Sequence, residues 1–420
     1  MPALTLTLGE PGAVPATIIL TPAPAAMTFG SADPSLPTLF PPETTLSYRA
    51  ENADAMPGYV TAQADTTFGT QITRVSNVAG QRHRYSSKAA WNSDETLMLL
   101  DYPPGGSGSA RAILDGASYA VLQATNDTMG NFTWCNTDPN AAWAFSGLTI
   151  RKLTVTGGGG ISVASSTSLA ASYSAIDLGG GQGSIDNADL YLAFLWKKSN
   201  NDHGIGVFST TSLTVIAERT IGNSAVAIGA LIDNCGMSQS GAYVIGGMQV
   251  GAGTGATYGT HVYPRAMTSD RQLTTGQAHW DVGLMADGTT DVIVIASQNS
   301  TGGGTGSHLG MYRLSDGLYT SLLSNWPNGH VSCRNTGRPG YVYASSFSSS
   351  GETFAGYHNV FAIKLDAPST VEMFGTVHGP TTSGYATEPQ FCASPTGKRG
   401  VFASKWSGAD VYPFVCGMDV

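Results

Sequence analysis

The sequence predicts an all-β fold, a seven-bladed β-propeller closed by an N-terminal strand in its last blade and preceded by an extended Pro-rich arm. Three observations lead to this fold. The 420 residues are 41% hydrophobic, include 53 glycines and are only 12% charged, a balance typical of short strands joined by polar turns. A β-rich apolar run recurs seven times. The last unit lacks one strand, which a segment near the start of the chain can supply.

The apolar run returns at a nearly constant interval. Successive runs start 45, 49, 51, 50, 49 and 60 residues apart, which is the spacing of propeller blades. The runs cover residues 96–101, 141–145, 190–196, 241–247, 291–296, 340–345 and 400–404. The four strands of a propeller blade are lettered a to d in chain order. Each run follows a tight polar turn, so we predict that it is strand b, which forms a hairpin with strand a. Strand a is predicted at 90–91, 132–135, near Ile185, and at 235–237, 280–282, 330–333 and 389–392, with strands c and d in 308–323 and 359–376.

The two ends of the chain are predicted to share one blade. Residues 412–420 supply a strand c, after which no strand d follows. The isolated strand at 71–76 comes just before the first blade and fits this empty outer position. A ring joined in this way leaves no open edge at its seam.

Residues 1–45 form an arm ahead of the propeller, which comprises residues 46–420. Short β-prone pieces (LTLTL, ATIIL) alternate in the arm with Pro-rich breaks such as TPAPAA. Such an arm either adds strands to the sheet of a partner or serves as a linker without fixed structure. The composition allows both.

Charge and hydropathy exclude several classes of function. The net charge is −9 and no basic stripe is present, which argues against nucleic-acid binding. No apolar run is long enough to span a bilayer, so we expect no membrane insertion. The first residues, MPALTLTLGEPGAVP, lack the pattern of a secretory signal peptide. The five cysteines show no CxxC spacing and are expected mainly as small buried hydrophobes.

All eight histidines map to one face of the predicted propeller. In a blade meander the a–b and c–d turns lie on one face, and the b–c and d–a loops lie on the other. Four histidines come just before a strand c: His203, His261, His308 and His358. Three lie at the entry to a strand a, namely His83, His279 and His330, and His378 lies in a d–a loop. Long Gly-rich loops share this face, so we predict that it is the binding face.

Other polar and aromatic residues join this predicted binding set. They are Arg82, Arg84, Tyr85, Asp281, Arg334, Glu388, Trp196, Tyr258, Tyr357 and Trp406. Each has a structural alternative: a histidine can bond the backbone of a neighbouring blade, Arg334 can form an inter-blade salt bridge with Asp281 or Glu388, and the aromatics can serve packing rather than sugar stacking. His83, His279 and His330 lie at the channel mouth and could also hold a divalent metal ion.

Two parts of the propeller resemble known families. The segment at 388–406, EPQFCASPTGKRGVFASKW, is similar to the repeat of TolB-type propellers, with Thr396 where Asp is usual. The HRYS, HWD and HVSCRN segments, which begin at His83, His279 and His330, resemble propeller-fold polysaccharide lyases of the oligogalacturonate and ulvan type. That resemblance implies β-elimination, with His279 or His330 as base, Tyr85 as proton donor and Arg334 as carboxylate neutraliser.

The arm resembles the Thr-, Ala-, Pro- and Gly-rich leaders of bacteriophage structural proteins. This likeness implies a virion-associated tail or head appendage, such as part of a tail fibre, that meets a host surface glycan or receptor. The arm would then dock on another virion or surface protein, and the location would be the virion or the extracellular space. The alternative function is a lyase or depolymerase that cleaves uronate-containing glycans.

Overall fold

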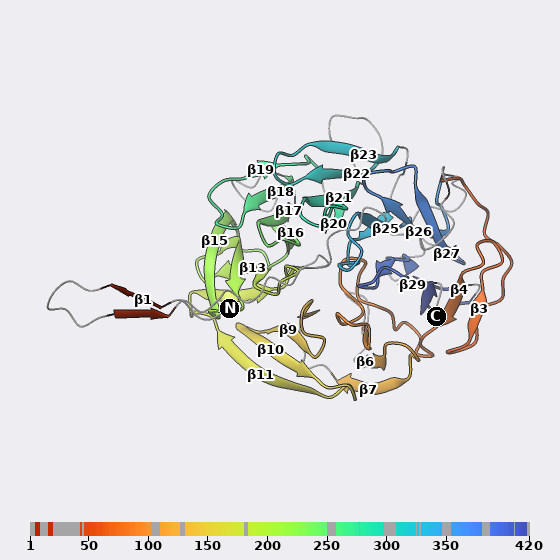
Figure 1. Ribbon diagram of the computed structural model, residues 1–420, viewed down its shortest axis with the longest axis horizontal. Coiled ribbons are helices and arrows are strands. Elements are labelled where there is room, and N and C mark those ends of the chain that lie inside the picture. The colour runs from red at the N-terminus through yellow and green to blue at the C-terminus, as the bar shows by residue number, and fades with distance from the viewer. Residues whose placement is uncertain are drawn as a thin grey trace.

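Seven antiparallel sheets surround a central axis in the computed structural model of the chain (Figure 1). The structure describes residues 5–8, 16–19, 43, 46–101, 110–126, 131–179, 184–249, 258–276, 278–297, 308–324, 326, 329–346, 354–379, 387–406 and 408–417. The predicted all-β, seven-bladed propeller is confirmed. No helix among these residues is long and apolar enough to cross a membrane.

Each sheet is one blade, numbered here from the first to the seventh along the chain. The first three blades contain β5 (Leu97–Leu100), β6 (Ala110–Asp115) and β7 (Val121–Asn126); β8 (Asn131–Trp134), β9 (Ala141–Ser146), β10 (Thr149–Val155) and β11 (Ile161–Ser168); and β12 (Tyr173–Asp177), β13 (Tyr191–Lys198), β14 (Asp202–Ser209) and β15 (Thr214–Asn223). The fourth and fifth contain β16 (Ile232–Met237), β17 (Tyr243–Met248), β18 (Gly259–Pro264) and β19 (Arg271–Gln272); and β20 (Ala278–Leu284), β21 (Asp291–Ser297), β22 (His308–Arg313) and β23 (Tyr319–Ser324). The last two contain β24 (Gly329–Ser332), β25 (Tyr341–Ser346), β26 (Asn359–Lys364) and β27 (Val371–Thr376); and β28 (Cys392–Ala393), β29 (Arg399–Ser404), β30 (Tyr412–Gly417), β4 (Gln71–Arg74) and β3 (Ala62–Ala64).

The predicted apolar runs are the second strands of the blades, and both of their faces are buried. Successive residues of a strand point to opposite faces of the sheet. In β21, Val292 and Val294 pack against the sixth blade, whereas Ile293 and Ile295 pack against the fourth. The buried residues form seven clusters of this kind in the described part of the chain, each between two neighbouring blades. The runs are therefore apolar throughout rather than alternating.

The first strands of the propeller, β3 and β4, lie in the seventh blade beside its last strands. β4 pairs antiparallel with β30, with Ile72 opposite Cys416 and Thr73 opposite Val415. β3 adds a fifth strand outside β4. The five cysteines, Cys416 among them, are buried and free.

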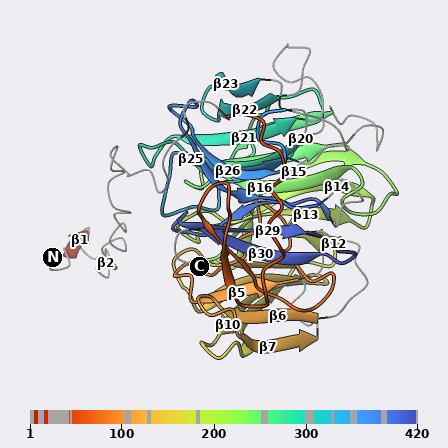
Figure 2. The ribbon, with the colours of Figure 1, turned by 90° about the vertical axis from the view of Figure 1, so that its right-hand side faces the viewer.

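Most of residues 1–45 lie outside the described residues. β1 (Thr5–Leu8) and β2 (Ala16–Ile19) pair antiparallel and stand to the side of the ring in Figure 1 and Figure 2. Glu43 exchanges two backbone hydrogen bonds with Val371 of β27. Leu46 is buried in the cluster between the fifth and sixth blades. The predicted role of the arm in docking stays a prediction.

The first blade has an irregular inner segment where a strand was predicted. This segment makes two isolated bridges in place of a strand, from Trp91 to Met98 of β5 and from Arg82 to Asp101. Ahead of Trp91 the chain turns at Ser86 and Ser87, and the amide of Lys88 donates to the carbonyl of Tyr85. This turn interrupts the inner strand of the first blade.

A carboxylate at the start of a second strand ties neighbouring blades together at three places. Asp189 accepts from the amides of Asn136 and Thr137 in the turn of the second blade. Asp291 accepts from the amide of Ser240 in the fourth. The third tie lies across the seam between the seventh and first blades.

At the seam, Glu95 of the first blade binds two residues of the seventh. Its carboxylate accepts from the amide of Thr396 at 2.7 Å and from Arg399 Nε at 2.9 Å. The two charged side chains are only 11% and 12% exposed, so solvent screens this pair less than a surface pair.

We predict that Glu95→Ala destabilises the ring, because it removes the carboxylate that accepts from the Thr396 amide and from Arg399 Nε. The expected loss in the free energy of unfolding is about 2 kcal/mol, and Glu95→Gln, which keeps an acceptor oxygen, should lose less. Urea unfolding measures both. Asp316→Ala, which breaks an exposed pair with Arg313, is the control and should change little; an equal loss in all three variants would contradict the proposed role of the seam.

Candidate functional site

Three aromatic side chains and one carboxyl group form a contiguous layer at the channel mouth. The imidazoles of His279 and His330 stack with their centroids 4.5 Å apart. The ring of Tyr85 meets both edge-on, at 5.1 Å from His330 and 6.5 Å from His279. Glu388 Oε2 lies 3.5 Å from His330 Nε2. The structure thus brings together Tyr85, His279 and His330, which sequence analysis had picked from three separate segments.

The position of these residues at the ends of strands explains their convergence. His279 and His330 lie at the starts of β20 and β24, the innermost strands of adjacent blades. His279 donates from Nδ1 to the carbonyl of Gly329 at 3.1 Å. This bond joins the two strands next to the stacked rings and orients the His279 ring.

Burial favours the uncharged form of both histidines and of Glu388 in this layer. It lowers the pKa of His279, and it lowers the pKa of His330 well below the usual range with help from the charges of His279, Arg82 and His83. Burial also raises the pKa of Glu388 to about 7. At neutral pH the contact between His330 and Glu388 therefore joins a neutral imidazole to a carboxyl group that can take or release a proton.

His83 lies near this layer but faces another way. Its Nε2 donates to the carbonyl of Gln390 at 2.5 Å, and its buried Nδ1 has no hydrogen-bond partner among the residues that the structure describes. Burial, followed by the charge of Arg82, lowers the pKa of His83 to about 3. Its imidazole is therefore neutral across the physiological range.

The residues present do not fit the metal site that was predicted as possible at His83, His279 and His330. Among the described residues, no three His, Cys, Asp or Glu side chains are grouped so that they could hold a metal ion. The physical reason is visible in the contacts: His83 is engaged with a carbonyl, and the other two rings stack face to face instead of directing nitrogens at one point.

Arg334 forms the inter-blade salt bridge that was one of its two predicted alternatives. Its Nε and Nη2 donate to the two carboxylate oxygens of Asp281 at 3.0 and 2.8 Å, and Nη2 also donates to the carbonyl of Val282. Asp281 is fully buried and Arg334 is 6% exposed. A ligand carboxylate would have to compete with this bidentate pair.

The other predicted histidines lie at the same end of the blades but do not join the central layer. His203 donates to the carbonyl of Ser224, and His358 to that of Val377. His261 contacts Asp270, and His308 begins β22. His378 stacks on Trp406 at 3.8 Å and contacts Glu51.

The predicted loop aromatics serve packing in three cases out of four. Trp196, Tyr357 and Trp406 are all buried, and Trp406 Nε1 donates to the carbonyl of Asp54. Tyr258 is the partly exposed one, and its carbonyl accepts from Gln272. A sugar could reach only Tyr258 of these rings without rearrangement.

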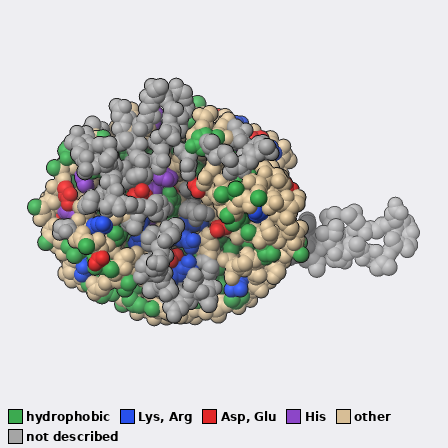
Figure 3. All heavy atoms as spheres, turned by 180° about the vertical axis from the view of Figure 1, so that it is seen from behind, with side chains coloured by type: hydrophobic (Ala, Val, Ile, Leu, Met, Phe, Trp, Pro, Cys, Tyr) green, Lys and Arg blue, Asp and Glu red, His purple; other side chains and the backbone are tan. Residues whose placement is uncertain are grey.

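Lys88 is the functional candidate that sequence reasoning missed. It comes from the irregular segment of the first blade, yet its Nζ donates to Ser184 Oγ of the third blade at 3.0 Å. Figure 3 shows Lys and Arg side chains (blue) gathered in the middle of the face that also presents His side chains (purple). The alternation of Arg84, Ser86 and Lys88 in the HRYSSK segment was a signal that sequence analysis could have used. The turn at Ser86 and Ser87 left no recognisable pattern in the sequence.

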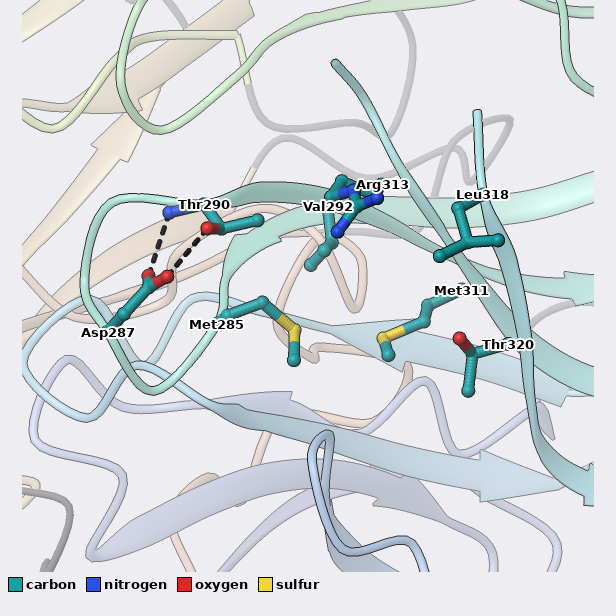
Figure 4. Close-up of a pocket in the computed structure, with 8 residues that line it drawn as sticks. All are labelled: Met285, Asp287, Thr290, Val292, Met311, Arg313, Leu318 and Thr320. Carbon is teal, nitrogen blue, oxygen red and sulfur yellow. Dashed lines mark hydrogen bonds between the residues drawn. The ribbon is translucent and has the colours of Figure 1, made fainter. Parts of the chain in front are cut away.

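The pocket drawn in Figure 4 lies at the opposite end of the blades. It has a volume of about 280 Å³ and is lined by Met285, Val292, Met311 and Leu318 together with polar groups of two turns of the fifth blade. The carboxylate of Asp287 turns away from the space to accept from Thr290 in its own turn. The pocket offers apolar surface but none of the acid–base groups of the channel mouth.

We predict that the contribution of His83 to the stability of the folded protein is lost as the pH falls below about 6.5. His83 has a pKa of about 3 in the folded chain against an ordinary value of 6.5, so its contribution is complete above pH 6.5 and is lost as the pH falls toward 3, by about 1.4 kcal/mol per pH unit. Glu388 acts in the opposite sense: its contribution is present below 4.5 and is lost as the pH rises to about 7.

Urea unfolding of the wild type and of His83→Gln at several pH values measures the effect of His83. The variant should show a shallower loss of stability on acidification. The difference between the two proteins at about pH 8, where the imidazole is neutral in both folded and unfolded chains, gives the packing cost of the substitution by itself. Parallel curves for the two proteins would contradict the assignment to His83.

The comparison with solved structures agrees with the propeller fold. No family model and no curated protein matches the sequence. Among solved structures, an oligogalacturonate lyase in complex with manganese superposes with a TM-score of 0.59 at 11% identity, over 88% of this chain and 98% of its own. An oligogalacturonate lyase from Vibrio parahaemolyticus gives 0.60 at 9% identity, over 85% and 96%. At such identities the likeness is one of fold: the chain is a seven-bladed β-propeller similar in architecture to these lyases.

Proposed function

We propose that the propeller binds an acidic glycan containing uronate residues at its channel mouth. The observation that carries this proposal is the gathering of Lys and Arg side chains in the middle of the histidine face (Figure 3), in a chain whose net charge is −9. A local concentration of positive charge attracts a carboxylate-bearing ligand in spite of the overall repulsion. The fold likeness to two oligogalacturonate lyases supports the same class of ligand.

Arg84 is the cation best placed to receive the carboxylate. Its side chain is 21% exposed and lies 3.6 Å from Asp101, whose other oxygen contacts Arg111. Arg82 is fully buried, and Arg334 is held by Asp281. A partly exposed guanidinium can bind a ligand carboxylate from its solvent side through two parallel hydrogen bonds.

We expect Arg84→Gln to weaken the binding of polygalacturonate by about tenfold or more, because a hydrogen bond to a charged group contributes about 1.5–3 kcal/mol. Calorimetric titration of the folded protein measures the affinity, which should also fall as salt is added. Arg313→Gln, on the opposite face, is the matched control and should bind normally. Equal affinity for dextran, a neutral glycan, would overturn the proposal.

Cleavage of the same glycan by β-elimination is the second candidate function. It is favoured by the contact of Tyr85 with His279 and His330 beside Glu388. In this reaction a neutral imidazole removes the proton on the carbon next to the carboxylate, and a carbon–carbon double bond forms as the glycosidic oxygen leaves. The leaving oxygen takes a proton from Tyr85, and Arg84 stabilises the carboxylate while it carries the extra charge.

A lyase would release unsaturated oligosaccharides, which ultraviolet absorbance detects. Tyr85→Phe should lower kcat by about 10²–10⁴-fold, since it removes the acid, and should leave the affinity nearly unchanged. No unsaturated product from several uronate polymers, with and without a divalent metal ion, would reject cleavage and leave the binding proposal standing.

The virion setting of this binding activity remains a proposal. It depends on the composition of residues 1–45, most of which lie outside the described residues. The backbone bonds between Glu43 and Val371 show where the end of this arm contacts the sixth blade. A tether that starts there would leave the histidine face open to a host glycan.

A further inference from the structure

A buried lysine connects two blades of the propeller that are not neighbours. Lys88 belongs to the first blade, is 5% exposed, and donates from Nζ to Ser184 Oγ of the third blade. Ser184 in turn donates its hydroxyl hydrogen to the carbonyl of Leu178, so it can only accept from the lysine. None of the ion pairs among the described residues involves Lys88.

The surroundings of Lys88 disfavour its positive charge. Burial is the largest effect, and the charge of Arg84 is the next; together with Arg334 these outweigh Asp177 and Cys235, which act in the other direction, and the pKa of Lys88 falls to about 7. Near neutral pH about half of the molecules therefore carry a free amine at this position. An amine close to other cations in a desolvated site is a good nucleophile toward carbonyl carbon.

We propose that Lys88 is a carbonyl-reactive amine that takes small aldehyde or keto acids. The nitrogen attacks the carbonyl carbon, and the two amine hydrogens leave with the carbonyl oxygen as water, which gives an imine. Arg84, which is four residues earlier and partly exposed, is the group that would hold the carboxylate of the ligand. This chemistry requires neither glycan binding nor β-elimination.

The other lysines make the proposal testable on the unaltered protein. The chain has six of them, Lys152, Lys197, Lys198, Lys364, Lys398 and Lys405, and all are partly or fully exposed. An exposed lysine reacts as an amine only as the pH approaches its ordinary pKa of about 10.4. Reaction at Lys88 should instead reach half of its maximal rate near pH 7.

The experiment is to incubate the wild-type protein with glyoxylate and cyanoborohydride, which reduces an imine to a stable secondary amine. Mass spectrometry of the intact protein and of its peptides then locates the adduct. We expect one dominant adduct, on Lys88, at pH 7. An adduct spread over the exposed lysines and the N-terminus, with Lys88 unmodified, would overturn the proposal.

Two variants separate reactivity from a structural role. Arg84→Gln removes the nearest positive charge, so it should raise the pH at which Lys88 reacts and slow labelling by glyoxylate several-fold at pH 7. Glycolaldehyde, which has no carboxylate, should show less slowing. Lys88→Arg keeps a positive charge and should lose the adduct. A pH profile unchanged by Arg84→Gln would show that the arginine does not act on Lys88. Because neither measurement uses a glycan, its outcome is independent of the binding proposal.

Discussion

The arrangement at the channel mouth depends on one buried ion pair, that of Asp281 with Arg334. Both side chains are taken out of water between the fifth and sixth blades, and the amide of Cys333 gives Asp281 a further hydrogen bond. Gln239 of the fourth blade donates to the carbonyls of Val282 and Cys333 and so ties a third blade to the same point. A buried pair of this kind is costly to break, since loss of one partner strands the other charge.

This pair also determines the geometry of the histidines. His279 precedes Asp281 by two residues on β20, and His330 precedes Arg334 by four at β24. Two contacts thus hold the two inner strands in register: the bond from His279 to Gly329 at the starts of the strands, and the ion pair of Asp281 with Arg334 further along them. The stacked imidazoles are a consequence of how the blades are joined, and they are rigid for the same reason.

Much of the fold could be predicted because a strand packed on both faces needs a continuous apolar run, and seven such runs stand out in the sequence. The inner residues could be predicted only in part. Tyr85, His279 and His330 were found through their place in the repeat, but their mutual contact is not encoded in spacing. The salt bridge of Arg334 was predicted as one alternative, but spacing could not decide between Asp281 and Glu388 as its partner. Lys88 was missed because its role depends on a turn that breaks the repeat and on a third-blade serine nearly a hundred positions away.

The seventh blade has a consequence for the order in which the molecule forms. β4 comes early in the chain, whereas its partner β30 is synthesised after the six other blades. Until β30 emerges, β4 has an unpaired edge, and the first and last blades have uncovered apolar flanks. Joining them closes a loop of more than three hundred residues, a contact of the least local kind, and such contacts slow folding. A ribosome-bound chain would therefore hold an open, incomplete ring for most of its synthesis, and completion of the ring would be the last step rather than the first.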